Sequence, residues 1–229
     1  MIIKNIFSCF YSYILDLLAP PVCAYCRVSL HDQAAILCSD CTARITPISS
    51  TYLVGTGMGP SGIKVLCITD YTDPLRKLIL AKGHKSRRAA RQLGELIVRY
   101  SYILEQDFDY IVPVPLHWTR YAQRGFNQAT EISYIISAYS NKPVIELVKR
   151  VKKTQFQAEC AQSERINNVK NAFELDQIVF KKNPEFYHGK KILLVDDLLT
   201  TGSTLRATAQ VLAQLKPELL TAVVACRVA

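Results

Sequence analysis

One run of thirteen residues constrains the fold of this chain more than any other, the stretch ILLVDDLLTTGST from Ile192 to Thr204. It opens with an apolar segment typical of a strand that is buried on both faces. Two adjacent carboxylates, Asp196 and Asp197, follow at the end of that strand, and hydroxyl residues with one glycine lead into a helix. Open α/β sheets bind ligands at such strand-to-helix junctions. The run therefore predicts a parallel α/β sheet with a ligand site at its carboxyl edge.

The second half of this run is suited to a phosphate group. Gly202 allows the backbone to approach an anion, and the amides that start the next helix can donate to it. The sequence has no Walker A motif, which argues against ATP or GTP hydrolysis of the P-loop type. Because carboxylates repel a phosphate, the two aspartates are expected to face sugar hydroxyls or a Mg²⁺ ion. The residues assigned to the phosphate are Thr200, Thr201, Gly202, Ser203 and Thr204.

Apolar runs and amphipathic stretches alternate through residues 63–229, which is typical of an α/β domain. A segment rich in Ser, Thr, Gly and Pro precedes this domain, and residues 51–62 are predicted to be a linker. Strands are predicted at 65–71, 110–114, 144–148, 191–195 and 220–226, and helices at 74–82, 87–104, 128–139 and 203–215.

Four cysteines lie in two CxxC pairs separated by eleven residues: Cys23, Cys26, Cys38 and Cys41. Two such pairs can supply a closed tetrahedron of thiolates, which is typical of structural Zn²⁺ rather than catalytic Zn²⁺. A zinc module is predicted over residues 21–50. The alternative, redox or incidental cysteines, is less consistent with two matched pairs. The four other cysteines are isolated, which favours a reducing cytoplasm over a disulfide framework.

The charge of the chain favours anionic partners. The formal net charge is +9, and the segment from Lys64 to Arg99 contains nine basic residues and three acidic ones. Clustered cations attract phosphate-rich ligands, nucleic acids or anionic membranes alike. Residues 1–20 are predicted to form an amphipathic helix and not a transmembrane segment, with contact to a membrane surface as the alternative.

Two further segments belong to the predicted site. The strand ending in VPVPLH is followed by RGFNQ, whose Arg124 and helix-start amides are suited to a second anion. Residues 150–173 are polar with basic ends and are expected to form a long mobile loop over the site. Ordinary surface charges and an ordinary surface loop are the alternatives.

Together these features resemble the ComF family of competence proteins, and the resemblance covers nearly the whole chain. The run around Asp196 and Asp197 resembles the phosphoribosyl diphosphate signature of type I phosphoribosyltransferases. The resemblance implies that these two aspartates are the catalytic pair on the ribose hydroxyls and that Thr200–Thr204 bind the 5-phosphate. It also implies a diphosphate loop of Arg124, Gly125 and Asn127, and a flexible loop with Arg150, Gln157 and Arg165.

By this resemblance the protein acts in DNA uptake during natural transformation, alongside other competence or recombination proteins. If it is an enzyme, it transfers the phosphoribosyl group, with Mg²⁺, to a nitrogen acceptor that the sequence does not identify. One alternative is a non-catalytic protein that binds single-stranded DNA through phosphate contacts and base stacking. Another is a nucleobase salvage phosphoribosyltransferase. The basic residues assigned to DNA are Lys82, Lys85, Arg87 and Arg88.

Overall fold

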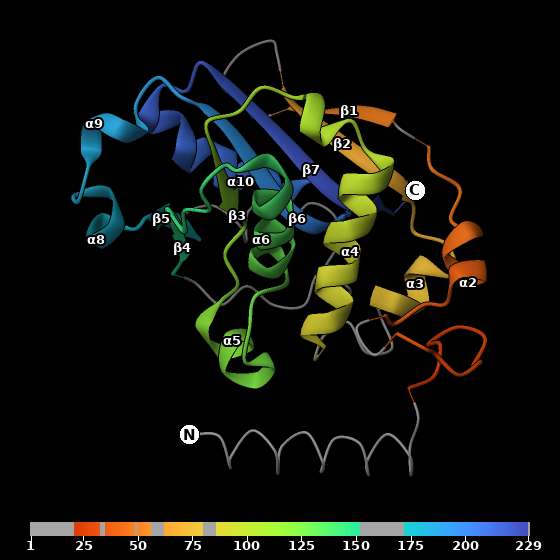
Figure 1. Ribbon diagram of the computed structural model, residues 1–229. Helices are drawn as coiled ribbons and strands as arrows, with labels where there is room; N and C mark the ends of the chain where they lie inside the picture. Colours follow the sequence, from red (N-terminus) through yellow and green to blue (C-terminus); the bar gives the residue numbers. More distant parts are fainter. Residues whose placement is uncertain are drawn as a thin grey trace.

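The computed structural model describes residues 21–32, 35–48, 50–55, 62–79, 86–151 and 172–228. A five-stranded sheet with the order β1-β2-β7-β6-β3 forms its centre (Figure 1). Four strands run parallel and β1 adds an antiparallel edge, so the predicted α/β class with a mostly parallel sheet is confirmed. The strands are β1 (Ser50–Val54), β2 (Ile63–Asp70), β3 (Tyr110–Pro113), β6 (Lys191–Leu199) and β7 (Leu219–Arg227).

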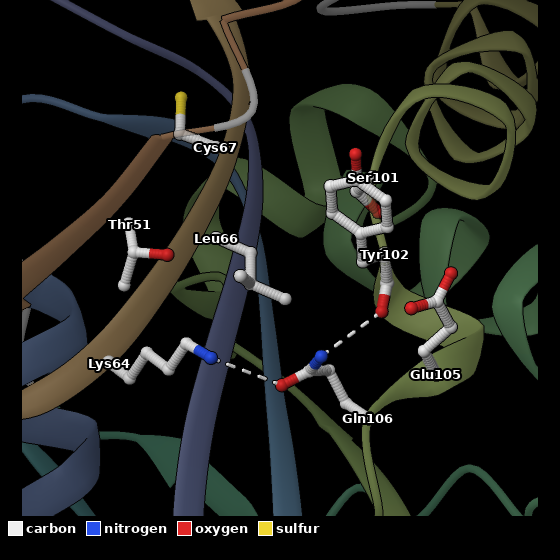
Figure 2. A pocket seen from close by; sticks show the side chains of 8 residues that line it. All are labelled: Thr51, Lys64, Leu66, Cys67, Ser101, Tyr102, Glu105 and Gln106. Carbon is white, nitrogen blue, oxygen red and sulfur yellow. Dashed lines mark hydrogen bonds between the residues drawn. The ribbon is translucent and has the colours of Figure 1, made fainter.

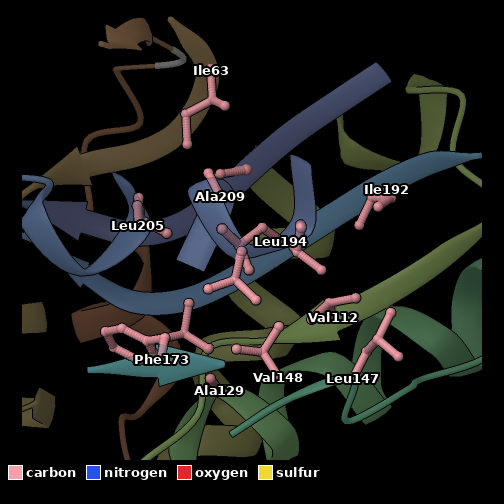
Figure 3. Packing of buried hydrophobic residues seen from close by; sticks show 14 of the residues in the cluster. Ile63, Val112, Ala129, Leu147, Val148, Phe173, Ile192, Leu194, Leu205 and Ala209 are labelled. Carbon is pink, nitrogen blue, oxygen red and sulfur yellow. The ribbon is translucent and has the colours of Figure 1, made fainter. Parts of the chain in front are cut away.

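Both faces of the sheet are buried, which explains the unbroken apolar run in β6. Ile192 and Leu194 pack in one core with Leu205 of α10 (Ser203–Leu212), as Figure 3 shows. Leu193 and Val195 point into the other core, which includes residues of α4 (Arg87–Tyr100) and α6 (Gln128–Ser140). Side chains alternate across a strand, so one continuous apolar segment serves two cores.

Helix α4 follows from its cap and its periodicity. The Ser86 hydroxyl accepts a hydrogen bond from the amide of Ala89 at the N-terminus, and buried residues recur three or four positions apart along the helix. Helix α6 packs closely against it, because a Cβ placed on Gly94 would lie 2.7 Å from Cβ of Ile135. Asn127 caps the N-terminus of α6, and Asn141 ends that helix with a φ of 56°.

Several short elements escaped the sequence-based prediction. One helical turn carries too little periodicity to be recognised, although its cap residues are visible in the sequence. The short helices that escaped it are α2 (Ser39–Ala43), α5 (Trp118–Arg124), α8 (Gln177–Phe180) and α9 (Pro184–Tyr187). Helix α3 (Leu75–Lys77) and the 3-10 turns at Ile103–Glu105 and Ala213–Leu215 lie within or at the ends of the helices predicted at 74–82, 87–104 and 203–215. Among the described residues, no helix combines the length and apolar character needed to cross a bilayer.

Two predictions are corrected by the structure. Residues 51–54, expected in a linker, belong to β1, because Tyr52 and Leu53 pair in register with Val65 and Lys64 of β2. The predicted strand at 144–148 is also wrong in its position, since Val144 forms only an isolated bridge. The strand there is β4 (Val148–Arg150), which pairs with β5 (Phe173–Leu175) as a separate antiparallel ribbon. Leu147 and Val148 are apolar because they pack under that ribbon in the core shared with α10.

The cysteine-containing segment packs on the α/β domain rather than standing apart from it. Leu37 and Ile45 share a hydrophobic cluster with Leu66 of β2 and Leu93 of α4. The side-chain oxygen of Gln92 accepts hydrogen bonds from the amides of Ile36 and Leu37, at 2.9 and 3.1 Å. Helix α4 is therefore the main support of this segment.

Candidate functional site

The carboxyl ends of the four parallel strands meet at one edge of the sheet. Arg227 of β7 lies in register with Leu199 at the end of β6 and with Asp70 at the end of β2. Its Nε is 2.7 Å from Oδ1 of Asp70, an ion pair that ties two strand ends together. The segments that follow β6 and β3 at this edge carry the two predicted anion motifs.

The turn between β6 and α10 has the geometry expected of a phosphate-binding loop. Gly202 stands at the N-cap of α10 with a φ of 69°, a left-handed conformation that glycine adopts at little cost. Because the N-cap residue is a glycine, no side chain at this position accepts a hydrogen bond from the amides of α10. Thr201 Oγ1 donates to Oγ of Ser203 at 3.0 Å and accepts from the Ser203 amide at 3.4 Å, which shapes the turn.

The two aspartates occupy different environments at the end of β6. The Asp197 amide donates to Oδ1 of Asp196 at 2.9 Å. Burial and the charge of Asp197 raise the pKa of Asp196 well above its usual value, while the Arg150 guanidinium acts in the opposite direction. Asp197 also acts on Arg124: burial and the charge of Arg120 lower the pKa of Arg124, and the Asp197 carboxylate opposes that lowering. The charge of Asp196 thus reaches Arg150 of β4, and the charge of Asp197 reaches Arg124 at the end of α5.

Two arginines of α5, Arg120 and Arg124, and Arg150 of β4 lie within range of one another's charge at this edge. Burial and the charge of Arg120 lower the pKa of Arg124. Burial and the same Arg120 charge lower the pKa of Arg150 to about 10, against the effect of Asp196. Cations crowded in this way gain from a polyanionic ligand, which relieves their mutual repulsion. The fold therefore brings the predicted acidic pair, the RGFNQ motif and Arg150 together.

The loop after β3 is held by hydrogen bonds. Gly125 ends α5 with a φ of 77°. The Asn127 side chain donates to the carbonyl of Val114 at 2.9 Å and accepts from the Ala129 amide at 3.2 Å. Asn127, which we expected to contact diphosphate, thus joins the end of β3 to the start of α6. Arg124 Nη1 donates to Oε1 of Gln128 at 3.1 Å, which orients its guanidinium.

The remaining predicted residues lie partly outside the described ranges. Gln157 and Arg165 of the flexible loop, and Lys82 and Lys85 of the basic run, fall in this group. Arg88 is exposed in the first turn of α4. Arg87 contacts Gly125 and Glu131, a pairing that sequence reasoning missed, because nothing in the local pattern links residues so far apart.

The four cysteines of the predicted module come together. Their Sγ atoms all lie within 4.8 Å of one another, and Cys26 and Cys38 are 3.7 Å apart. A tetrahedral site with Zn–S bonds of about 2.3 Å has edges of about 3.8 Å, so the donors fit such a metal ion. Burial alone would raise the pKa of Cys23, but amide hydrogen bonds, among them that of Cys38, prevail and lower it to about 6. The cluster can therefore bind a metal such as zinc.

A polar pocket lies away from this edge. Its volume is about 340 Å³, and Lys64, near the amino end of β2, donates to Gln106 across it at 3.3 Å (Figure 2). The candidate site lies at the opposite, carboxyl end of the parallel strands. The full lining is Thr51, Lys64, Leu66, Cys67, Ser101, Tyr102, Glu105 and Gln106.

Comparison with known proteins places the chain. Residues 122–229 match the model of the phosphoribosyl transferase domain. The chain is 33% identical to "Competence protein F" of Haemophilus influenzae, over 86% of this chain and 92% of that protein. It is 29% identical to "DNA utilization protein YhgH" of Escherichia coli K12, with the same coverage of both chains.

Among solved structures, the glutamine phosphoribosylpyrophosphate amidotransferase from B. subtilis, complexed with ADP and GMP, aligns at 15% identity with a TM-score of 0.39. The alignment covers 62% of this chain and 26% of that one. The parallel sheet with helices on both faces, the matching phosphoribosyl transferase domain and the near full-length relatives agree with one another. This chain belongs to the competence protein F (ComF) family and carries a type I phosphoribosyltransferase fold.

Proposed function

We propose that the carboxyl edge of the sheet binds phosphoribosyl diphosphate with Mg²⁺. The observation that carries the proposal is the left-handed turn at Gly202 between the aspartate-bearing end of β6 and the uncapped start of α10. This turn offers backbone amides to a phosphate monoester. The neighbouring carboxylates offer acceptors to the ribose hydroxyls, and the Mg²⁺ ion, when bound with the ligand, offsets part of the diphosphate charge.

The positions of the arginines support the same ligand. Arg124, at the end of α5 in the segment after β3, interacts electrostatically with Asp197. The charge of Asp196 acts in the same way on Arg150 of β4. A ligand with hydroxyls at its centre and phosphates at both ends matches this alternation of acceptor and donor groups.

The reaction that this site supports is phosphoribosyl transfer. The lone pair of a nitrogen forms a bond to the anomeric carbon while the bond from that carbon to the diphosphate oxygen breaks. Diphosphate leaves with the electron pair of the broken C–O bond. The nitrogen then loses its proton to solvent. The arginines stabilise the leaving charge and the aspartates orient the sugar, so the protein acts by positioning and electrostatics. Cellular use of this activity lies in DNA uptake or utilisation, as the names of the relatives suggest.

Calorimetric titration tests the ligand. Native protein with Mg²⁺ is expected to bind phosphoribosyl diphosphate, and Asp197→Asn is expected to weaken binding at least about tenfold by removing a charged hydrogen-bond acceptor. A native protein that shows no heat and no thermal shift with this ligand would contradict the proposal. Release of diphosphate in the presence of candidate bases then reports on catalysis.

We also propose that the four-cysteine cluster holds a structural Zn²⁺ ion and that the protein works in the cytoplasm. The closed set of four sulfur donors supports the first proposal, since it leaves no position for a substrate. The second is supported because none of the six described cysteines is paired in a disulfide. Metal analysis of protein purified under reducing conditions is expected to give one zinc per chain.

Binding of single-stranded DNA is a second candidate function, favoured by the surface of α5. No residue of this helix is buried, and it exposes 70% of Trp118 and 52% of Tyr121 beside Arg120. Exposed aromatic rings can stack on the bases of single-stranded DNA, and neighbouring cations can contact its phosphates. Affinity for a single-stranded oligonucleotide is expected to fall with salt and with Trp118→Ala. Binding that neither change affects would argue against this role.

A further inference from the structure

Arg87 at the start of α4 contacts the loop that follows β3. Its Nη2 donates to the carbonyl oxygen of Gly125 at 3.0 Å, and its guanidinium carbon lies 5.5 Å from the centre of the Phe126 ring. Its Nη1 is 3.2 Å from Oε1 of Glu131. A planar guanidinium that meets three partners at once has its orientation fixed.

Glu131 provides a rigid anchor for this arginine. Its side chain is only 7% exposed, and its second oxygen accepts from Nε of Arg91 at 2.9 Å. A buried carboxylate needs such partners, because an unpaired charge in the interior is costly. Arg91 thus holds Glu131 from the next turn of α4, while Arg87 links the same carboxylate to the loop.

The Gly125 turn depends on hydrogen bonds for its shape. A Cβ placed on Gly125 would meet no atom within 4 Å, so side-chain packing does not confine this residue. Its amide donates to the carbonyl of Tyr121 at 2.7 Å, and its own carbonyl accepts from Arg87. In a trans peptide the C=O and the following N–H point in opposite directions, so fixing the Gly125 carbonyl also fixes the Phe126 amide.

We propose that Arg87, anchored by buried Glu131, is a positioning residue for the anion-binding loop formed by Arg124 to Asn127. It sets the direction of the Gly125–Phe126 peptide and thereby the geometry in which the loop meets the diphosphate end of the ligand. The role assigned to the ligand rests on the proposed function, whereas the role assigned to the loop rests on the contacts of Arg87 with Gly125, Phe126 and Glu131.

Three single substitutions on one helix separate this role from simple loss of charge or stability. Arg87→Gln removes the bonds to both Gly125 and Glu131. Arg91→Gln removes an ion pair to the same Glu131 but leaves the bond from Arg87 to Gly125 in place, and Arg88→Gln removes one positive charge at the neighbouring position. Arg87→Lys keeps a charge near Glu131 but lacks the fork needed to hold both partners, and it serves if the glutamine variant fails to fold.

Hydrogen–deuterium exchange of residues 124–127 in the ligand-free protein gives the first readout. Exchange is expected to rise in Arg87→Gln and Arg87→Lys and to match the native protein in Arg88→Gln and Arg91→Gln. Calorimetry with phosphoribosyl diphosphate and Mg²⁺ gives the second, with an expected loss of about tenfold or more in affinity for the Arg87 variants alone.

The two readouts distinguish the possible failures. If native protein binds the ligand but the Arg87 variants match Arg88→Gln in both exchange and affinity, the positioning role is wrong. If native protein does not bind the ligand, the proposed function fails, and loop exchange alone then decides whether Arg87 positions the loop. If exchange of residues 124–127 rises as much in Arg91→Gln as in Arg87→Gln, the effect comes from the loss of an ion pair to Glu131. That result would overturn the specific role of Arg87.

Discussion

Gly202 and Val54 lie in contact, so that a Cβ on Gly202 would stand 3.0 Å from Cγ1 of Val54. The phosphate-type turn after β6 is therefore backed by β1, the strand at the edge of the sheet. This contact gives β1 a part in the site, because it limits the space behind the amides of α10. Gly202 is required both by its φ of 69° and by its neighbour.

Gly202→Ala is expected to destabilise the protein and to abolish binding of phosphoribosyl diphosphate. A left-handed alanine costs about 1–2 kcal/mol, and the close contact with Val54 adds to this. Gly189→Ala is a matched control, since Gly189 has a φ of 63° and open space around it. Thermal unfolding and calorimetry are the measurements. The control should lose some stability yet bind normally, and normal binding by Gly202→Ala would refute the assignment of the turn.

Asp196→Asn is expected to stabilise the ligand-free protein at pH 8 while it weakens ligand binding. Burial and Asp197 raise the folded-state pKa of Asp196, so its proton stabilises the fold fully below the unfolded pKa of about 3.9. That stabilisation is lost as the pH rises through the raised pKa. Asparagine cannot ionise, so it avoids the loss, and Asp196→Asn is expected to unfold at a higher temperature than the native protein at pH 8.

Thermal unfolding at pH 4 and pH 8 checks this prediction, because the difference between the native and Asp196→Asn proteins should shrink at the lower pH. Asp107→Asn makes the same change of charge at a site where the carboxylate is paired with Lys191 at 2.6 Å. That hydrogen bond lowers the pKa of Asp107, so this control should show no gain at pH 8. An Asp196→Asn protein less stable than native at pH 8 would contradict the assigned environment.

The residues of the candidate site were easier to recognise in the sequence than the contacts that support them. The β6 run could be recognised because a strand buried on both faces and a glycine turn are local signals. The pairing of Arg91 with Glu131 spans 40 residues, and no local pattern contains it. Asn127, which the family resemblance assigns to the diphosphate loop, also caps α6, and its role toward a ligand stays a prediction.

Element boundaries show where local reasoning fails. Residues 51–54, Thr-Tyr-Leu-Val, are mostly of types that favour strands, but the Ser, Gly and Pro residues around them led to the linker prediction; the structure pairs them with β2. The ribbon of β4 and β5 likewise depends on residues 148 and 175 meeting across a long insertion.

Removal of the metal is expected to destabilise the whole domain and not only the cysteine segment. Cys23 and Cys41 belong to the same hydrophobic cluster as α4 and β2, and Gln92 holds the backbone between the cysteine pairs. Chelation should therefore lower the unfolding temperature of the main transition. Cys26→Ser is expected to lose the metal, whereas Cys67→Ala, which removes a buried thiol outside the cluster, should retain it. Metal analysis measures the zinc content of the variants, and calorimetric unfolding measures the effect of chelation. If chelation leaves the main unfolding transition unchanged, the metal site does not stabilise the whole domain.

Gly94→Ala is expected to destabilise the protein even though alanine is the better helix former. In an exposed helix this change gains about 1 kcal/mol. Here the new Cβ would meet Ile135 of α6 at 2.7 Å, so α4 and α6 must separate, at a cost of about 1–3 kcal/mol. Separation would also strain the bonds from Arg87 and Arg91 to Glu131, because these bonds join the same two helices. Denaturant unfolding measures the sign of the change, and a stabilised Gly94→Ala protein would show that the two helices are not in close contact.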